Sequence, residues 1–297
     1  MASGAPKELI EHSVKVGTNL DLVQASGGNT SWKSTGTVWV KGSGKCLKDA
    51  NSQQIFAQIN FGELSQSQII SCLDFTPYTN GSITPSIETN FHILIDNPFV
   101  THLHSLAAIA FGSMKLSSND ISELCERNNI SILPYVRPGV DLAREIIDVQ
   151  DCQKRILLLE NHGVIFSAEN TSELEFKIRN FEKEVSNFIE LIPTNENLPN
   201  WIDILTQGVL TPDEAVFLGE TPFVKSENPI QNLINIKSDG CVNFPEGISQ
   251  DRKDLAHFYV RVAKLIEKKA AINYLTDTEV TSLLRWDKEK LRIAMAK

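Results

Sequence analysis

The 297-residue sequence predicts an α/β fold, in which strands and helices alternate along the chain. Segments with apolar residues at helical spacing and charges between them predict amphipathic helices, of which residues 171–192 form the longest. Short runs of β-branched and aromatic residues predict strands, as at residues 38–40 and 98–105. A hydrophobic content of 41% gives a chain of this length enough apolar material for a large core. Interleaved elements of this kind form a sheet that helices cover.

Further elements of the N-terminal two thirds follow from the same patterns. The first predicted helix covers residues 7–25, where apolar side chains recur at helical spacing. Residues 105–112 are a small, apolar segment. Helices are predicted at residues 120–128 and 140–149, beside strands that carry candidate site residues.

A polar segment bounded by prolines, residues 192–200, follows the longest helix. We therefore assign residues 1–200 to one domain and residues 201–297 to a C-terminal extension that packs on it. Within the extension we expect strands near residues 215–218 and a helix at residues 254–271.

Charge and cysteine content limit the classes of function. A formal net charge of −9 argues against a nucleic-acid partner and against an anionic membrane surface. No apolar run approaches the ~18 residues that cross a bilayer, and no apolar stretch follows Met1, so we expect a cytoplasmic protein. The five cysteines are widely spaced and form no C-x-x-C motif, which favours free thiols in a reducing compartment.

Three histidines are candidate metal ligands. His102 and His104 lie two residues apart in a predicted strand, so both imidazoles project from one face while Leu103 faces the core. His162 lies at a turn between two apolar strands. Three protein ligands with an open position are typical of a catalytic metal, and imidazole suits Zn²⁺, with Mn²⁺ or Co²⁺ as alternatives. A lone H-x-H pair is also compatible with two ordinary half-buried side chains.

Glu88 is the candidate carboxylate ligand. Ser86 is predicted to cap a helix, which places Glu88 in its first turn and His92 one turn later. The helix dipole alone favours a carboxylate there, so the position has a structural explanation as well. His92 is expected to support the site or to be a satisfied, half-buried histidine, and a fourth imidazole ligand is the less favoured alternative.

Two turns rich in small residues, residues 25–33 and 41–45, are candidate phosphate cradles. Glycines let the backbone approach an anion, and hydroxyl and amide groups can add hydrogen bonds. Neither turn is a nucleotide P-loop, because Trp39 replaces its first glycine and Cys46 follows Lys45. Hairpin connections are the alternative explanation. Any phosphate would be held by local groups such as Lys41, Lys45 and backbone amides.

Five motifs in this order resemble the class II aldolase/adducin family, which includes fuculose- and rhamnulose-phosphate aldolases and ribulose-phosphate 4-epimerase. They are Gly28-Asn29-Thr30-Ser31, Ser43-Gly44, Pro85-Ser86-Ile87-Glu88, His102-Leu103-His104 and Asn161-His162-Gly163. The resemblance covers residues 5–190 and implies a three-layer α/β/α fold with a mostly antiparallel central sheet. Residues 210–219 and the closing helices resemble the aldolase half of bifunctional rhamnulose-phosphate aldolase/dehydrogenase proteins.

The resemblance also assigns roles to residues. It implies a divalent metal, Zn²⁺ above others, held by His102, His104, His162 and Glu88. It implies a substrate phosphate held by Asn29, Ser43, Gly44 and Ser86. Glu88 would also transfer a proton, and Tyr135 would act as the proton donor. Ile87 departs from the family pattern, which often has a second serine there, and this puts the phosphate site in question.

The activity that follows is metal-dependent cleavage of a ketose 1-phosphate, rhamnulose 1-phosphate in particular, to dihydroxyacetone phosphate and an aldehyde. Another lyase, a dehydratase, a decarboxylase or a 4-epimerase acting on a sugar phosphate at the same metal site is the first alternative. A non-catalytic, adducin-like interaction module is the second, although adducins lack the metal ligands that this chain has. The resemblance further implies a homo-oligomer, most often a tetramer, with sites near subunit interfaces.

Overall fold

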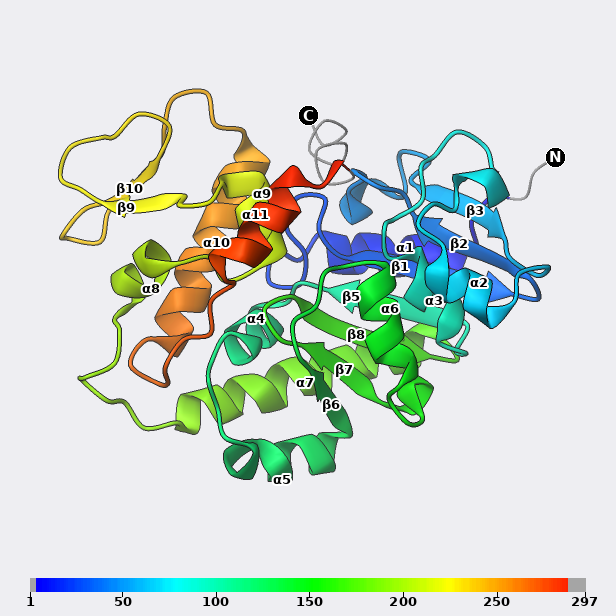
Figure 1. Ribbon diagram of the computed structural model, residues 1–297, viewed down its shortest axis with the longest axis horizontal. Coiled ribbons are helices and arrows are strands. Elements are labelled where there is room, and N and C mark those ends of the chain that lie inside the picture. The colour runs from blue at the N-terminus through cyan, green and yellow to red at the C-terminus, as the bar shows by residue number, and fades with distance from the viewer. Residues whose placement is uncertain (1–3, 288–297) are drawn as a thin grey trace.

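A computed structural model describes residues 4–287, and a mixed sheet lies at its centre (Figure 1). In this part of the chain the sheet has eight strands in the order β4-β3-β2-β1-β5-β8-β7-β6. Only β6 and β7 run parallel among these neighbours, so the predicted mostly antiparallel α/β fold is confirmed. The strands are β1 Asn29–Ser34, β2 Thr37–Lys41, β3 Phe56–Asn60, β4 Thr79–Asn80, β5 Phe99–Leu103, β6 Ile130–Leu133, β7 Ile156–Leu159 and β8 Gly163–Ala168.

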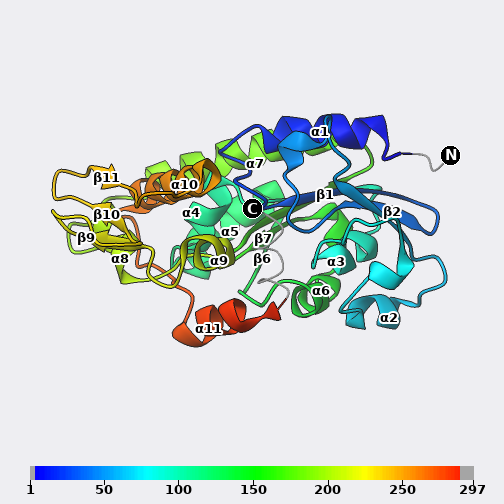
Figure 2. The same cartoon turned by 90° about the horizontal axis from the view of Figure 1, so that it is seen from above.

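Helices cover both faces of this sheet and produce the three layers (Figure 2). The helices α1, α4 and α7 lie on one face, while α2, α3 and α6 lie on the other, and α5 packs at the β6 edge. Their bounds are α1 Lys7–Gly17, α2 Gln66–Ser71, α3 Thr89–Leu94, α4 Leu106–Gly112, α5 Ser118–Asn128, α6 Val140–Ile147 and α7 Thr171–Leu191. Single 3₁₀ turns occupy Leu47–Asp49, Thr76–Tyr78 and Cys152–Lys154.

The central strand β5 shows why the sequence needs helices on both faces. All five of its residues are buried, and successive side chains point to opposite sides of the sheet. Val100 packs in a cluster with Phe91 of α3, whereas Leu103 packs in a second cluster with Phe181 of α7. Each face therefore has its own apolar core, and His102 belongs to the same face as Val100.

Residues beyond 200 add four helices and a small sheet among the described residues. These are α8 Trp201–Gln207, α9 Pro212–Leu218, α10 Gln250–Ile266 and α11 Asp277–Arg285, with the strands β9 Phe223–Lys225, β10 Ile234–Ile236 and β11 Val242–Asn243 in the order β11-β10-β9. The helix α10 packs against α4, and its buried Phe258 belongs to the cluster that contains Leu103. The domain boundary at residue 200 stays a prediction.

Three predicted elements differ from the structure. The first helix ends at Gly17, because Gly17 packs directly on Leu47 and the chain then turns, leaving Leu20 47% exposed. Residues 215–218 belong to helix α9 and not to a strand. A short apolar run does not distinguish the two, but Thr211-Pro212 ahead of it is a helix start. The helix predicted at 254–271 begins earlier, where Ser249 caps α10, and ends at Ile266.

The sequence predicts no segment that is long and apolar enough to cross a membrane, and the helices of the structure can be compared with that prediction. Among residues 4–287, no helix combines the length and the apolar character that crossing a lipid bilayer requires.

Candidate metal centre

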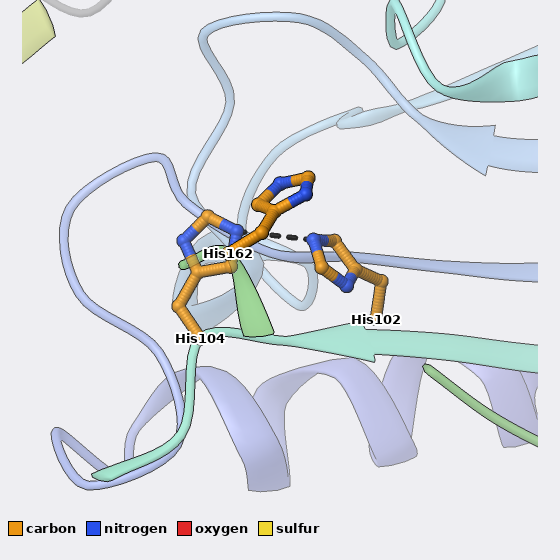
Figure 3. A group of neighbouring side chains, drawn as sticks. All are labelled: His102, His104 and His162. Carbon is orange, nitrogen blue, oxygen red and sulfur yellow. Dashed lines mark hydrogen bonds between the residues drawn. The ribbon is translucent and has the colours of Figure 1, made fainter. Parts of the chain in front are cut away.

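The end of β5 places two of the predicted ligands side by side. His102 and His104 project from the same face of the sheet, with ring centroids 4.8 Å apart. Leu103 between them is fully buried on the opposite face, as predicted. The strand is paired with β1 and β8 on its two sides, which fixes the register of His102 opposite Asn29 and Ile165. Figure 3 shows the two imidazoles facing one another.

The turn between β7 and β8 brings in the third histidine. Asn161 has a φ of 53° and Gly163 a φ of 153°, and both angles lie in the range that L side chains rarely adopt. A Cβ at Gly163 would lie 2.3 Å from the carbonyl oxygen of Leu103, so only glycine lets this turn pack against the end of β5. His162 then lies with its ring centroid 4.8 Å from that of His102, and nitrogens of all three histidines lie within 4.8 Å of one another (Figure 3).

Glu88 completes the group from the start of α3. The helix begins at Thr89, so Glu88 occupies the N-cap position, and the predicted cap at Ser86 is wrong. The Ser86 hydroxyl instead accepts the Glu88 backbone N–H, which forms a tight turn ahead of the helix. Glu88 Oε2 lies 3.8 Å from His102 Nε2, and Oε1 lies 3.5 Å from His162 Nε2.

Hydrogen bonds on the outer side of two rings determine which nitrogens face the centre. His102 Nδ1 donates to the carbonyl oxygen of Val164 at 3.1 Å, because a carbonyl can only accept. His104 Nδ1 lies 2.9 Å from Asp213 Oδ2 and donates to this carboxylate. The Nε2 atoms of both rings therefore face one another, 3.0 Å apart, within hydrogen-bond distance. Two lone pairs at this distance repel, so either a shared proton or a metal ion lies between them.

The remaining donor atom also fits a metal. Glu88 Oε1 is buried and has no hydrogen-bond partner among the described residues. A buried carboxylate oxygen without a partner is costly, so an ion at the centre would satisfy it. Three imidazole nitrogens and one carboxylate are a donor set that suits Zn²⁺ and similar divalent ions.

Burial keeps the imidazoles in the form that binds metals. Desolvation lowers the pKa of His102 well below its usual value of 6.5, with the neighbouring His104 as a smaller cause in the same direction. Desolvation also lowers the pKa of His162 to about 3. Both rings are therefore neutral near pH 7, and a metal ion would not have to displace protons from them.

A second layer of hydrogen bonds orients Glu88. Asn29 Nδ2 donates to Glu88 Oε2 at 2.7 Å, and the Asn29 side-chain oxygen accepts from His92 Nε2. The other nitrogen of His92 is paired with the Ser31 hydroxyl at 2.7 Å. Both nitrogens of His92 are thus used, which makes it a supporting residue, as expected, and leaves neither nitrogen to bind an ion as a fourth imidazole ligand.

One pocket is lined by all the residues that the sequence assigned to metal and phosphate except His102. Its cavity measures about 30 Å³, enough for an ion and a water molecule. Its lining includes Glu88, His104 and His162, and also the predicted phosphate residues Asn29, Ser43, Gly44 and Ser86. Lys41 lines it too, but its ammonium donates to the carbonyl oxygens of Ser26 and Lys45 and holds the turn together.

Tyr135 lies outside this pocket lining. It is half-buried and packs against an apolar cluster from the C-terminal part that includes Val209, Val216 and Leu283. Pro138, three residues later, does line the pocket. The catalytic role of Tyr135 stays a prediction.

Asp213 is the site residue that sequence reasoning missed. It lies in the first turn of α9, just before the residues where a strand was expected, and its side chain lines the pocket beside His104. We call residues 209–218 the C-terminal strap. Two sequence signals cover it: the helix start Thr211-Pro212-Asp213-Glu214, and the resemblance of residues 210–219 to bifunctional aldolase/dehydrogenase proteins. Neither of them by itself marks Asp213 as a site residue.

Comparison with protein families agrees with this geometry. A model of the class II aldolase and adducin N-terminal domain matches residues 7–185. The chain belongs to the class II aldolase and adducin family. This confirms the resemblance read from the sequence motifs. All three histidines and Glu88 lie within the residues that match the family, whereas Asp213 lies outside them.

Relatives of this class II aldolase family member include two curated proteins. The "Uncharacterized oxidoreductase YuxG" of Bacillus subtilis is 25% identical over 202 residues, which are 62% of this chain and 29% of that protein. The 3-oxo-tetronate 4-phosphate decarboxylase of Haemophilus influenzae is 30% identical over 135 residues, 39% of this chain and 64% of that enzyme. The chain thus spans less than two thirds of the length of each.

A solved structure supports the fold of the family domain. The N-terminal class II aldolase domain of a conserved protein from Thermoplasma acidophilum aligns with a TM-score of 0.52 at 25% identity. The alignment covers 64% of this chain and 97% of that domain.

Proposed function

We propose that the protein is a metal-dependent lyase that cleaves a ketose 1-phosphate to dihydroxyacetone phosphate and an aldehyde, with rhamnulose 1-phosphate as the first substrate to test. The observation that carries the proposal is the convergence of Nε2 atoms of His102 and His104, 3.0 Å apart, beside the unpartnered Oε1 of Glu88. A divalent ion held there by His102, His104, His162 and Glu88, Zn²⁺ before Mn²⁺ or Co²⁺, would supply a Lewis acid for the carbonyl and neighbouring hydroxyl groups of the sugar.

The chain's own residues would do the remaining work. Ser43, Gly44 and Ser86 would bind the substrate phosphate, since all three line the pocket that also contains Glu88. Glu88 would take up and return a proton at the carbon or hydroxyl next to the breaking bond, while Asn29 holds its carboxylate in place at 2.7 Å. Tyr135 would accept the proton of the hydroxyl that becomes the aldehyde oxygen, and it would donate that proton back in the reverse, condensing direction. We also propose a cytoplasmic homotetramer.

Decarboxylation is the second candidate, and one observation favours it. The 30% identical relative from Haemophilus influenzae is a 3-oxo-tetronate 4-phosphate decarboxylase. A decarboxylase on this site would use the same metal and phosphate groups but would release carbon dioxide instead of an aldehyde. The similarity to part of a protein named as an uncharacterized oxidoreductase is compatible with the bifunctional aldolase/dehydrogenase pattern. On that pattern rhamnulose 1-phosphate remains the first substrate to test.

The test combines metal analysis with product analysis. Protein purified without chelators or an affinity metal is compared with a His102→Ala/His104→Ala variant, and elemental mass spectrometry measures the metal in each. We expect about one divalent ion per chain in the parent and none in the variant. The exposed His257, changed to alanine, is the matched control and should retain the ion.

Products then distinguish the candidate reactions. Incubation of the metal-loaded protein with rhamnulose 1-phosphate and fuculose 1-phosphate should yield dihydroxyacetone phosphate and an aldehyde, detected by NMR. Carbon dioxide from a keto-acid phosphate, loss of water or an isomeric sugar phosphate would identify the alternative enzymes. A parent protein that binds no ion after incubation with each metal would contradict an enzyme and favour an interaction module.

A further inference from the structure

We propose that Asp213 is a positioning residue of the metal centre, through which the C-terminal strap orients His104. Its carboxylate accepts the Nδ1 proton of His104 and so keeps Nε2 unprotonated and directed at the ion. This inference rests on the metal site of the proposed function and extends that site beyond the residues that match the family, 7–185.

The geometry assigns Asp213 to the outer side of the ring. Asp213 Oδ2 lies 2.9 Å from His104 Nδ1, while Nε2 of the same ring lies 3.0 Å from His102 Nε2. The carboxylate and the three converging ligands therefore use opposite nitrogens of one imidazole. Both side chains are buried, with 4% of Asp213 and 7% of His104 exposed, so water competes weakly for this hydrogen bond. Carboxylates in this position fix the tautomer and raise the basicity of a metal-binding histidine.

The glycine turn before β1 is shaped around this pair. A Cβ at Gly27 would lie 2.7 Å from Asp213 Oδ2 and 2.9 Å from His104 Nδ1. Any side chain at residue 27 would therefore clash with both atoms of this hydrogen bond. Gly27, which the sequence suggested as part of a phosphate cradle, thus has a second purpose, to leave room for the carboxylate of the strap.

Hydrogen bonds tie the strap to the turn that carries His162. Asn161 Nδ2 donates to the carbonyl oxygens of Leu210 at 2.8 Å and Asn273 at 2.7 Å. The Asn161 side-chain oxygen accepts from Asn273 Nδ2 at 2.8 Å. Asn161 directly precedes a proposed ligand, so the same residue sets the position of His162 and of the chain that leads to Asp213.

Internal bonds of the strap hold Asp213 at a fixed point of its helix. Thr211 caps α9 by accepting from the Glu214 N–H, and Pro212 occupies the first turn. The Glu214 carboxylate folds back to accept the Leu210 N–H at 2.7 Å. Thr211 is also hydrogen bonded to the buried Tyr259 of α10. Asp213 is therefore presented by a segment that is anchored on both sides, as a positioning role requires.

The experiment compares full-length Asp213→Ala and Asp213→Asn variants with the parent. The variant Glu220→Gln, at an exposed carboxylate just after the strap, is the matched control. Competition with a chromophoric chelator measures the dissociation constants for Zn²⁺ and Co²⁺. We expect Asp213→Ala to weaken metal binding about 10- to 100-fold. Asp213→Asn keeps an acceptor oxygen, so its loss should be smaller, and Glu220→Gln should match the parent.

A second measurement reads the tautomer of His104 directly and needs no metal. Long-range ¹H–¹⁵N NMR spectra of the metal-free protein should show a proton on Nδ1 of His104 in the parent, and a mixture of Nδ1–H and Nε2–H forms in Asp213→Ala. Far-UV circular dichroism checks that the variant is folded. Unchanged affinity with an unchanged tautomer would overturn the proposal. Complete loss of metal, as in the double-histidine variant, would overturn it too, because Asp213 would then be a ligand.

The two readouts also separate this inference from the proposed function. If the parent binds no metal, the proposed function fails, yet the tautomer of His104 still tests the role of Asp213. If the parent binds metal and Asp213→Ala behaves as the parent, only the positioning role fails.

Discussion

The strand-end ligands and the C-terminal strap approach His104 from opposite sides. His102 and Glu88 lie on the Nε2 side and come from the central sheet and the helix beside it. Asp213 lies on the Nδ1 side and comes from residues that follow the sheet by more than forty positions. The Nε2 side supplies ligand atoms for an ion, and the Nδ1 side supplies a carboxylate that accepts a hydrogen bond from the imidazole of His104.

The two regions therefore have different roles in the site. The strand ends supply groups whose chemistry is needed at the ion, and these groups lie within the part of the chain that matches the family. The strap supplies packing, hydrogen bonds and one carboxylate, all outside that part. If this division holds, changes at the strand ends should abolish the reaction, while changes in the strap should alter affinity or stability.

The largest expected effect concerns Glu88. Glu88→Gln keeps the shape of the side chain and an oxygen for Asn29, but it removes the negative charge and the proton acceptor. We expect turnover with saturating metal to fall about 10⁴-fold, or about 5.5 kcal/mol, because charge stabilisation and proton transfer are lost together. Steady-state kinetics measure this loss, with Glu220→Gln as control. Turnover within tenfold of the parent would exclude Glu88 as the proton-transfer group.

The pH dependence of stability should distinguish the two regions by sign. Burial raises the pKa of Glu214 in the strap from 4.5 to about 8. The folded protein then holds a proton that the unfolded chain releases above 4.5, so the free energy of unfolding falls as pH rises from 4.5 to 8, by about 5 kcal/mol in total. Glu214→Gln should remove this decrease. Urea unfolding in the presence of a chelator, at pH 4.5 to 9, measures it.

His12 of α1, which packs under the central strand β5, should change the stability in the opposite direction with pH. Burial lowers its pKa from 6.5 to about 4, and its Nε2 is hydrogen bonded to Thr101 of β5. The unfolded chain binds a proton below 6.5 that the folded protein does not, so stability falls by about 3 kcal/mol as pH decreases from 6.5 to 4. His12→Gln should flatten that limb only. Equal slopes in parent and variant would show that burial does not control this histidine.

Removing the hydrogen bonds by which Asn161 connects the two regions should cost less stability than the titration of Glu214 does. Asn161→Ala leaves the carbonyl oxygens of Leu210 and Asn273 without their donor and puts alanine at a φ of 53°. We expect a loss of about 3 kcal/mol in the free energy of unfolding, from the lost hydrogen bonds and the strained backbone. Asn161→Gly is the matched control and should regain about 1 kcal/mol, because glycine adopts positive φ freely. Equal stability of the two variants would remove the backbone contribution.

How well the sequence predicted the fold depends on the length of each pattern. The helix of residues 171–191 and the strand of residues 99–103 were predicted well, because their apolar periodicity is long or flanked by turns. The strands β9, β10 and β11 have two or three residues each and carry no such periodicity. The apolar residues of α9 are too few to distinguish helix from strand, and only the cap ahead of them decides.

The residues of the candidate site also differ in how well the sequence predicts them. His102, His104 and His162 could be predicted because a short motif and a strand period place them. Asp213 and the pair of Asn29 with His92 could not, since each depends on a contact between distant segments. Asn29 was assigned to phosphate, yet its amide holds Glu88 in the structure. Ligands have a residue type that indicates their chemistry, whereas a supporting carboxylate or amide is indistinguishable from many others.

The smallest expected effect concerns Ser43, a predicted phosphate ligand that is neither a metal ligand nor part of the strap. Ser43 lines the pocket, and its backbone N–H already donates to Thr84, so Ser43→Ala removes only a hydroxyl. One neutral hydrogen bond contributes about 1 kcal/mol, so KM for a ketose 1-phosphate should rise about fivefold at unchanged kcat and unchanged metal affinity. Ser86→Ala should lower kcat as well, because the Ser86 hydroxyl also accepts the N–H of Glu88. The same KM change with an unphosphorylated ketose would mean that Ser43 contacts the sugar and not the phosphate.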